Sequence, residues 1–414
     1  SIEFSGSDTA TLFEVLRVYS NSNKTESLGK FSSSPILLDN LQENEPYYLK
    51  VKAINAYGSS QSTEVLGAVP SANSPKVLIV NGFDRIIGTN NTFDFIKEHG
   101  SALHSNDYLF DSASNEAIIN KYIKLTDYQI VDWILGEEGT ATSSFNEMEQ
   151  SLIQEFLMDG GKLFVSGSEI GYDLSEKGNV KDRLFYEKFL LADYKSDAAG
   201  GKQNNYNAYG IERTLFDGIN LSFDDGSQGS YDVDWPDGIK PIPNAEINLK
   251  FEEVNYDSSG GAGISYRGGF AGSPLYGGLV YLTVGFESIY PDNKRNEIMK
   301  RVMNFLDGPF TSIEQENPII PDKPRITALY PNPSNKSISI EFQIIRNTPI
   351  AYLTITDILG RELFKMSVQS LPTRSQKFNW TGTLKNGSEA PSGIYIAKLS
   401  QGNQLVTKRF TLLK

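Results

Sequence analysis

The sequence contains no cysteine and only two histidines among its 414 residues. The lack of cysteine excludes disulfides, thiolate metal sites and cysteine nucleophiles. With His99 and His104 as the only imidazoles, a histidine-rich metal site is excluded as well. The only kind of metal cofactor that this composition leaves open is a hard divalent cation, such as calcium, bound by carboxylates.

Long apolar runs and an excess of positive charge are also missing. No apolar run reaches the roughly 18 residues that a membrane-spanning helix needs. Acidic residues outnumber basic ones by 51 to 38, for a formal net charge of −13. This balance argues against nucleic acid or an anionic membrane as the main partner, because both select basic patches, and it also favours solubility. The chain begins at Ser1 rather than at a methionine, which leaves open that a leader has been removed.

The length predicts two to four domains, because one hydrophobic core rarely serves so many residues. A linker-like stretch rich in proline and serine separates residues 1–72 from residues 74–308. A second linker, residues 309–325, is rich in proline and poor in apolar pattern. Residues 326–414 follow as the last domain.

The first domain is predicted to consist of short strands joined by polar turns. Leu41 and Tyr47 are six residues apart, and apolar residues alternate from Leu49 to Ala53. Such alternation forms one face of a strand, and a tyrosine before it can bond back across the corner. This spacing resembles the fibronectin type III module, a β-sandwich that serves as a spacer or a binding unit. Because residues 1–4 resemble the second strand of that module, we expect the sequence to begin inside a domain of a longer protein.

The middle domain alternates apolar strands with amphipathic helices. This alternation predicts βαβ units and a doubly wound parallel sheet. A weaker region over residues 175–274, rich in Gly, Asn and Asp, is expected to be an insertion with extra strands such as 248–254. Strands are predicted at 76–80, 108–110, 128–135, 162–165 and 278–284, and helices at 92–99, 115–122, 145–158 and 293–306.

The last domain reads as a small antiparallel β-sandwich made of short alternating strands. Its motifs resemble the type A C-terminal sorting domain of the type IX secretion system of Bacteroidetes. The resemblance implies export through the periplasm to the outer-membrane surface or the extracellular space. It also implies recognition by the translocon and cleavage by the sortase machinery. The motifs are Tyr330–Pro333, Ile338–Phe342, Ile355–Arg361, Pro391–Lys398 and Thr407–Phe410.

The middle domain resembles the class I glutamine amidotransferase-like fold, a flavodoxin-like sheet with its nucleophile at an elbow after a central strand. In that family the elbow reads Gly-x-Cys-x-Gly, whereas residues 167–171 here read Gly-Ser-Glu-Ile-Gly, which puts Glu169 in the nucleophile position. The place of the oxyanion loop carries Glu137 and Glu138. Where the family has His-x-Glu, Glu287 is present but the histidine is not. Glutaminase chemistry is therefore not implied, because both the nucleophile and its base are missing.

Four carboxylates are thus expected near one edge of one sheet: Glu137, Glu138, Glu169 and Glu287. Like charges in a cleft push one pKa upward, so that a pair can divide the roles of acid and base. Two carboxylates suffice to cleave a glycosidic bond, and such oxygens also bind calcium or magnesium. The alternative is that these residues are solvated positions at strand ends.

A serine mechanism is a further possibility. Ser168 or Ser166 would be activated by His104 or His99 in the region of the first helix. The pattern is weak, because residues 167–171 do not match the Gly-x-Ser-x-Gly elbow of esterases. A histidine near a helix end is more commonly a cap or a surface residue.

Three other residues are candidates for substrate binding. Asp84 and Arg85 follow the first predicted strand and would orient a polar substrate, or else form an ion pair that fixes the turn. Trp235 would supply an aromatic platform for a sugar, or close a small core. The aspartates around it, from Asp224 to Asp237, do not follow the EF-hand spacing.

Segments 81–85, 136–138, 166–174 and 285–289 together are similar to a family of Bacteroidetes surface proteins labelled xanthan lyase-like or amidase-like. Those labels do not establish an activity. The leading hypothesis is a surface hydrolase of a glycan or peptidoglycan-type substrate that uses Glu169 with Glu137 or Glu287. The alternative is a non-catalytic adhesin or glycan-binding protein on the same fold, and the sequence leaves open whether the domain is an enzyme.

Overall fold

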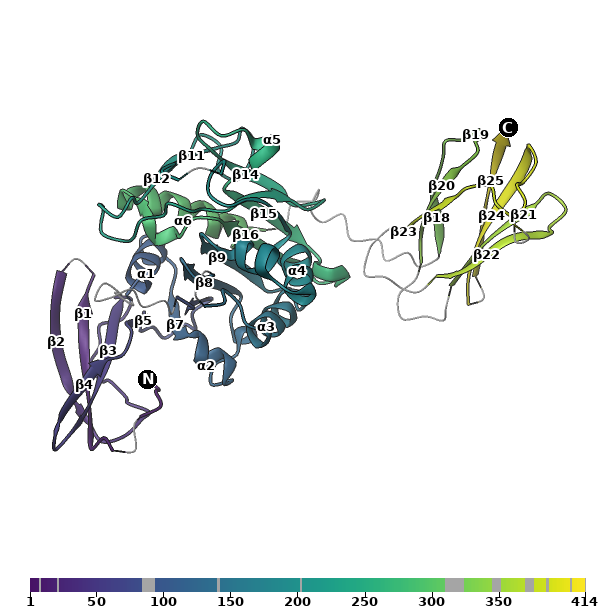
Figure 1. The fold of residues 1–414 in the computed structure, drawn as a ribbon. Coiled ribbons are helices and arrows are strands. Elements are labelled where there is room, and N and C mark those ends of the chain that lie inside the picture. Colours follow the sequence, from purple (N-terminus) through teal and green to yellow (C-terminus); the bar gives the residue numbers. More distant parts are fainter. Residues whose placement is uncertain are drawn as a thin grey trace. The chain divides into compact units, whose positions relative to one another are not determined.

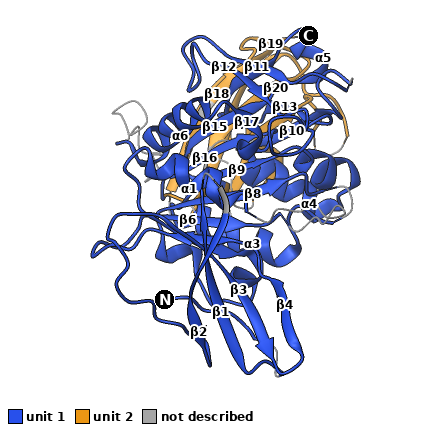
Figure 2. Ribbon diagram, turned by 90° about the vertical axis from the view of Figure 1, so that its left-hand side faces the viewer, with its two compact units in different colours: residues 1–270, 275–309 blue, residues 271–274, 310–414 orange. Residues whose placement is uncertain are grey.

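The computed structural model shows a β-rich, multidomain chain that forms two compact units (Figures 1 and 2). Unit 1 comprises residues 1–270 and 275–309, and unit 2 comprises residues 271–274 and 310–414. None of the helices in the described ranges combines the length and apolar character that a membrane crossing requires. The structure describes residues 1–6, 9–20, 22–83, 94–139, 142–201, 203–309, 324–344, 351–368, 376–384, 387–402 and 404–413.

Unit 1 begins with an antiparallel sheet in the order β2-β1-β3-β4, with β5 paired to β3. Its core is formed by Phe13, Val15, Ile36 and Val51. The hydroxyl of Tyr47 accepts a hydrogen bond from the backbone N–H of Gln42 at 3.0 Å, which is the return bond predicted across this corner. The strands are β1 (Leu12–Tyr19), β2 (Ser22–Phe31), β3 (Tyr47–Asn55), β4 (Gly58–Ser62) and β5 (Leu66–Ala68).

A ten-stranded mixed sheet follows, in the order β17-β12-β11-β14-β15-β16-β9-β8-β6-β7. Its pairs β6–β7, β6–β8, β8–β9 and β9–β16 are parallel. Every residue of β6, β8 and β16 is buried, as their largely apolar sequences predict for strands covered on both faces. The parallel strands are β6 (Val77–Asn81), β7 (Phe110–Ser114), β8 (Ile130–Gly136), β9 (Lys162–Gly167) and β16 (Gly277–Leu282).

Helices lie on both faces of this sheet (Figure 1). On one face α1 packs against α6, and on the other α3 lies between α2 and α4. Helix α3 starts at a capping box, in which Asn146 accepts from the backbone N–H of Glu149 and Glu149 accepts from that of Asn146. The helices are α1 (Ile96–His104), α2 (Asn115–Ile119), α3 (Glu147–Met158), α4 (Val180–Phe185) and α6 (Asp292–Asp307).

The region predicted to be an insertion supplies antiparallel strands. Four of them, with β17 beyond, extend the main sheet past β16, while β10 and β13 pair separately. The predicted strand 248–254 corresponds to β14. The added elements are β10 (Ala192–Ser196), β11 (Asn207–Gly210), β12 (Asn220–Phe223), β13 (Gly238–Pro241), β14 (Glu246–Phe251), α5 (Tyr256–Ser259), β15 (Gly263–Gly268) and β17 (Ile289–Tyr290).

Unit 2 contains two sheets around a core that includes the packed rings of Trp380, Tyr395 and Phe410. One sheet has the order β18-β20-β23 and the other β19-β25-β24-β21-β22. The pairing is antiparallel, as predicted, except for the two-residue parallel pair β19–β25. The strands are β18 (Arg325–Tyr330), β19 (Ser334–Asn335), β20 (Ile338–Gln343), β21 (Ala351–Asp357), β22 (Glu362–Val368), β23 (Gln376–Trp380), β24 (Gly393–Gln401) and β25 (Gln404–Leu413).

Within unit 1, Tyr48 ties the first sheet to the mixed sheet. Its ring stacks on Phe110 with centroids 6.4 Å apart, and its hydroxyl lies 3.2 Å from that of Ser101. The backbone N–H of Val69 also donates to the carbonyl of Phe110 at 3.0 Å. A fully buried aromatic side chain therefore belongs to both cores.

Truncation of this tyrosine should loosen the whole of unit 1. We expect Tyr48→Ala to destabilise unit 1 by about 3–5 kcal/mol, as truncation of other buried large aromatics does. Tyr57→Ala is the matched control, because Tyr57 is 99% exposed. Calorimetric unfolding of the full chain measures both variants, and equal midpoints for the two would contradict the bridging role of Tyr48.

Candidate functional site

The elbow, residues 167–171, is held against the loop that follows β8. The backbone N–H of Ser168 donates to the carbonyl of Gly136 at 2.8 Å, and the Ser168 hydroxyl donates to the same oxygen at 3.3 Å. A Cβ on Gly139, whose φ is +132°, would lie 2.6 Å from the carbonyl oxygen of Glu169. Since Gly139 lies two residues after Glu137 in this loop, Glu137 and Glu169 are brought to the same edge of the sheet.

The buried carboxylate of Asp237 clamps the elbow from the other side. It accepts hydrogen bonds from the backbone N–H groups of Gly171 at 2.5 Å and Tyr172 at 3.2 Å. The backbone N–H of Asp237 donates to the carbonyl of Ser168 at 2.9 Å. These three bonds fix the turn between β9 and the π-helical segment Tyr172–Lys177.

Two carboxylates therefore influence one another beneath this turn. Burial raises the pKa of Asp237 well above its ordinary range, and the nearby charge of Glu169 raises it further, against the lowering effect of the two amides. Like charges in a buried setting favour retention of a proton by one of them. This arrangement provides an acidic group beside Glu169 that is protonated more readily than an exposed carboxyl.

A second set of buried polar groups is centred on His99. Its Nδ1 lies 2.8 Å from a carboxylate oxygen of Asp132 in β8, and its Nε2 lies 3.2 Å from one of Glu287. The other carboxylate oxygen of Glu287 accepts from the hydroxyl of Tyr231. At Gly285 a Cβ would lie 1.8 Å from that hydroxyl, so the approach of Tyr231 requires glycine there.

The His99 side chain is completely buried, yet its surroundings favour the charged form. Burial lowers the pKa of His99, but the charge and hydrogen bond of Asp132 and the hydrogen bond of Glu287 outweigh it and raise the pKa to about 9. Burial also raises the pKa of Asp132, although the His99 charge opposes this. The network thus holds a proton between histidine and aspartate at neutral pH.

Tyr231 connects the two parts of the edge. Burial and then the charge of Glu287 raise its pKa well above the ordinary value, and the charge of Glu137 adds to this effect. The ring of Tyr231 packs edge-on against Phe83 and Phe95 at 5.6 and 5.5 Å. Glu137 therefore lies near enough to Tyr231 for the two groups to interact electrostatically.

The four predicted glutamates differ in how far they are enclosed. Glu287 and Glu138 are each 1% exposed and Glu169 is 6% exposed, while Glu137 is partly exposed. Both oxygens of Glu287 are engaged by His99 and Tyr231. Glu287 is therefore held in the network, whereas Glu137 and Glu169 lie where the loop meets the elbow.

The predicted serine and its histidine do not come together. Helix α1 starts beyond the carboxyl end of β6 and leads into the parallel strand β7, so its last residue, His104, lies at the amino edge of the sheet. There its Nε2–H donates to the carbonyl of Asn44 at 2.9 Å. Ser168 lies at the carboxyl end of β9 instead. His99 is enclosed by Asp132 and Glu287.

The remaining candidates have other surroundings. Asp84 and Arg85 lie outside the described residues, and Trp235 is 39% exposed. Asp224 is buried and closes its own loop, because its carboxylate accepts from the backbone N–H groups of Gln228 and Ser230, both at 2.8 Å. Within the ranges that the structure describes, no three His, Asp or Glu side chains are grouped so as to hold a metal ion.

Sequence reasoning missed Asp132 and Tyr231, and it considered Asp237 only as one of the aspartates around Trp235. The family comparison also left no imidazole beside Glu287, but the fold brings one there from α1, 188 residues away in sequence. A usable signal existed for Asp132, because a carboxylate inside an otherwise apolar strand requires a buried partner. With only two histidines in the chain, His99 was a candidate for that partner.

The last residues match a known family. Residues 328–412 match the family described as Secretion system C-terminal sorting domain. This match supports a protein exported by type IX secretion to the cell surface or the extracellular space. No curated protein shows significant similarity to the chain.

Three solved structures show a weaker similarity to this chain. PorZ, a surface component of the type-IX secretion system of Porphyromonas gingivalis, is 22% identical over 21% of this chain and 11% of its own length, with a TM-score of 0.17. A ThuA-like protein from Bacteroides uniformis is 9% identical over 57% of this chain and 96% of its own, with a TM-score of 0.37. The FN1–FN3 domains of chicken CNTN1 are 9% identical over 99% and 92%, with a TM-score of 0.16. At these TM-scores the likeness assigns no activity.

The buried network around His99 predicts the pH at which this imidazole loses its proton. Because the pKa of His99 is raised from 6.5 to about 9, its charge stabilises the fold fully below pH 6.5, and this contribution is lost as the pH rises through about 9. An NMR titration of the two imidazoles, assigned with a His104→Gln variant, should give a midpoint near 9 for His99. A midpoint at or below 6.5 would show that His99 is held neutral.

Proposed function

We propose that this type IX-exported protein hydrolyses a bond in a glycan or peptidoglycan-type substrate at the carboxyl edge of its mixed sheet. The observation that carries the proposal is the buried Asp237 at the elbow, whose carboxylate accepts from the backbone of the turn and whose pKa is raised by burial and by the charge of Glu169. Paired carboxylates with shifted pKa values are typical of acid–base catalysis. Glycosidic bonds are cleaved by two such groups without a cofactor.

In this proposal Glu169 is the group that meets the substrate, and Glu137 supplies the second carboxylate. Glu137 is preferred to Glu287 because both oxygens of Glu287 already accept hydrogen bonds. Asp237 acts through Glu169, since its oxygens are occupied by backbone amides of the elbow. Glu169 and Glu137 would then divide the roles of acid and base, while Asp237 fixes the backbone that carries Glu169.

We further propose that the mixed sheet is a doubly wound, flavodoxin-like sheet within a domain spanning residues 74–308. Its parallel strands lie in the order β7-β6-β8-β9-β16, which is second-first-third-fourth-fifth along the chain. This order supports the proposal, because it is the strand order of flavodoxin-like sheets. Ligands of such sheets bind at the carboxyl ends of the strands, which is the edge that carries the elbow. Residues 1–72 would form a fibronectin type III-like module that packs on this domain through Tyr48, and residues 309–325 a linker to the sorting domain at 326–414.

Burial of the carboxylates favours a second candidate function. Glu138 and Glu169 are only 1% and 6% exposed, and an enclosed carboxylate reaches a substrate poorly. A protein that binds a surface glycan without cleaving it would require no reacting group at this edge. On this account the domain is an adhesin or glycan-binding module, and the translocon and sortase would still recognise the sorting domain.

Replacement of Glu169 separates the two functions. We expect Glu169→Gln to lower the release of reducing ends from peptidoglycan sacculi, chitin or xanthan by roughly 10²–10⁴-fold, the usual contribution of a general acid or base. Glu155→Gln, on the exposed face of α3, is the control and should leave the rate unchanged. If neither the parent chain nor either variant releases reducing ends but all bind the polymer, the binding function holds and hydrolysis fails.

The export function is tested without reference to any substrate. Deletion of residues 326–414 should leave the protein in the periplasm, because the sorting domain is the part that the translocon would recognise. Conversely, residues 309–414 fused to a periplasmic reporter enzyme should carry that enzyme to the cell surface. Cell fractionation and surface protease treatment measure both, and surface delivery of the truncated chain would refute the role of the sorting domain.

A further inference from the structure

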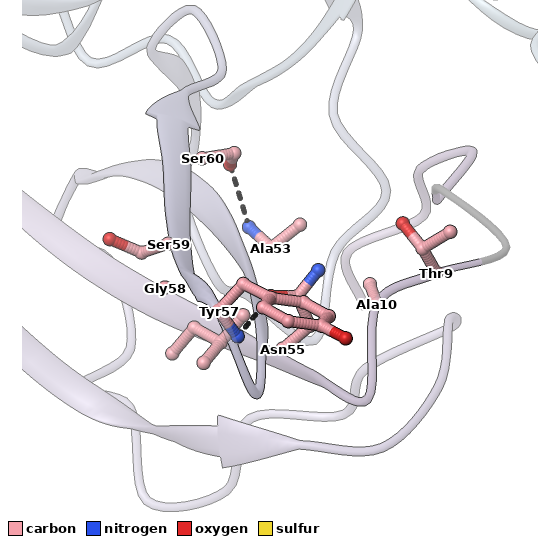
Figure 3. Close-up of a pocket in the computed structure, with 9 residues that line it drawn as sticks. Thr9, Ala10, Ala53, Asn55, Tyr57, Gly58, Ser59 and Ser60 are labelled. Atoms are coloured by element: carbon pink, nitrogen blue, oxygen red, sulfur yellow. Dashed lines mark hydrogen bonds between the residues drawn. The ribbon is translucent and has the colours of Figure 1, made fainter.

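A shallow hollow lies on the first sheet of unit 1, at the hairpin between β3 and β4 (Figure 3). Its volume is about 290 Å³. It is lined by the hairpin residues Asn55, Tyr57, Ser59 and Ser60 and by the segment Thr9–Ala10. This volume is close to the lower end of the range for small-molecule sites, about 300–1,000 Å³, and it suits a ligand of one or two small rings.

Tyr57 offers an unusually free aromatic ring at this place. Its side chain is 99% exposed, the highest value among the large hydrophobic side chains in the described part of the chain. Its backbone is nevertheless fixed, because its N–H donates to the side-chain oxygen of Asn55 at 2.8 Å. A ring held by a tight hairpin turn but not covered by other side chains is available to stack on a ligand.

The polar groups beside the ring fall into two classes. The hydroxyl of Ser60 is already engaged, because it accepts from the N–H of Ala53 at 3.0 Å and donates to the carbonyl of Gln61 at 2.6 Å. In contrast, the amide NH₂ of Asn55 and the hydroxyl of Ser59 form no hydrogen bond with the residues that the structure describes. The amide of Asn55 can donate two hydrogen bonds to a ligand in the hollow, and the hydroxyl of Ser59 can both donate and accept.

The lack of charged side chains among the described residues around the hollow restricts the class of ligand further. None of the described residues that line the hollow has a charged side chain. A ligand with its own charge would therefore gain no ion pair there, and the net charge of −13 disfavours anions in particular. A neutral molecule with one apolar face and a rim of hydroxyl groups fits this lining.

We propose that this hollow binds a neutral pyranose sugar as a mono- or disaccharide. The C–H face of the sugar stacks on the Tyr57 ring, while Asn55 and Ser59 hydrogen-bond to its hydroxyl groups. The site involves none of the carboxylates at the elbow, so it is independent of the hydrolysis proposed there. It would give the exported protein a second, non-catalytic contact with carbohydrate.

The test uses the full chain and four named probes. Saturation-transfer NMR is recorded with cellobiose, maltose and N,N′-diacetylchitobiose as neutral disaccharides, and with digalacturonate as a charged one. We expect a signal from at least one neutral disaccharide and a much weaker one from digalacturonate. Tyr57→Ala should weaken the binding at least tenfold, whereas Tyr57→Phe, which keeps the ring, should retain most of it.

Two controls keep the outcome interpretable. Tyr122→Ala removes another largely exposed tyrosine, 70% exposed and outside the hollow, and should leave binding unchanged. Glu155→Gln, on the exposed face of α3, should also leave it unchanged. The proposal is overturned if no neutral disaccharide gives a signal, if Tyr57→Ala binds as well as the parent chain, or if only digalacturonate binds.

Discussion

The burial of His99 between two carboxylates is the constraint on which the carboxyl edge of the mixed sheet depends. The imidazole of α1 is held by Asp132 of β8 and by Glu287 beyond β16, and Tyr231 closes the chain of bonds. Four segments far apart in sequence are thus fixed by one set of charges. Loss of one partner from such a buried pair costs about 3–5 kcal/mol, because the other charge is left uncompensated. The network explains why a histidine is retained inside an otherwise apolar core.

This constraint divides the acidic residues of the edge into two groups. Glu287 and Asp132 neutralise a buried cation and have no freedom to react with a ligand. Glu169 instead lies near another carboxylate, Asp237, and its charge raises the pKa of that buried group. Like charges kept together reduce stability, and such local losses are typical of functional sites. The same edge therefore contains a stabilising network and a pair of neighbouring carboxylates, and the proposed site uses the second.

Much of this architecture could be predicted from local sequence patterns. The apolar runs of β6, β8 and β16 and the periodicity of α3 and α6 identified strands and helices within a few residues of their ends. The motifs of the last domain led to the sorting family that residues 328–412 match. The site was harder to predict, because the contact of His99 with Glu287 spans 188 residues and leaves no local trace. Glu169 was proposed from a family pattern, but Asp237 lies in the loop-rich insertion, where nothing in the sequence indicates its partner.

The division of the carboxylates is tested most directly by comparing the unfolding free energies of Glu287→Gln and Glu169→Gln in the full chain at neutral pH. The account predicts that Glu287→Gln destabilises unit 1 by several kcal/mol, because it breaks the pairing of a buried imidazolium. It predicts that Glu169→Gln leaves stability unchanged or raises it, because removal of that charge relieves the repulsion with Asp237. A large loss of stability in Glu169→Gln, with little effect in Glu287→Gln, would contradict the account.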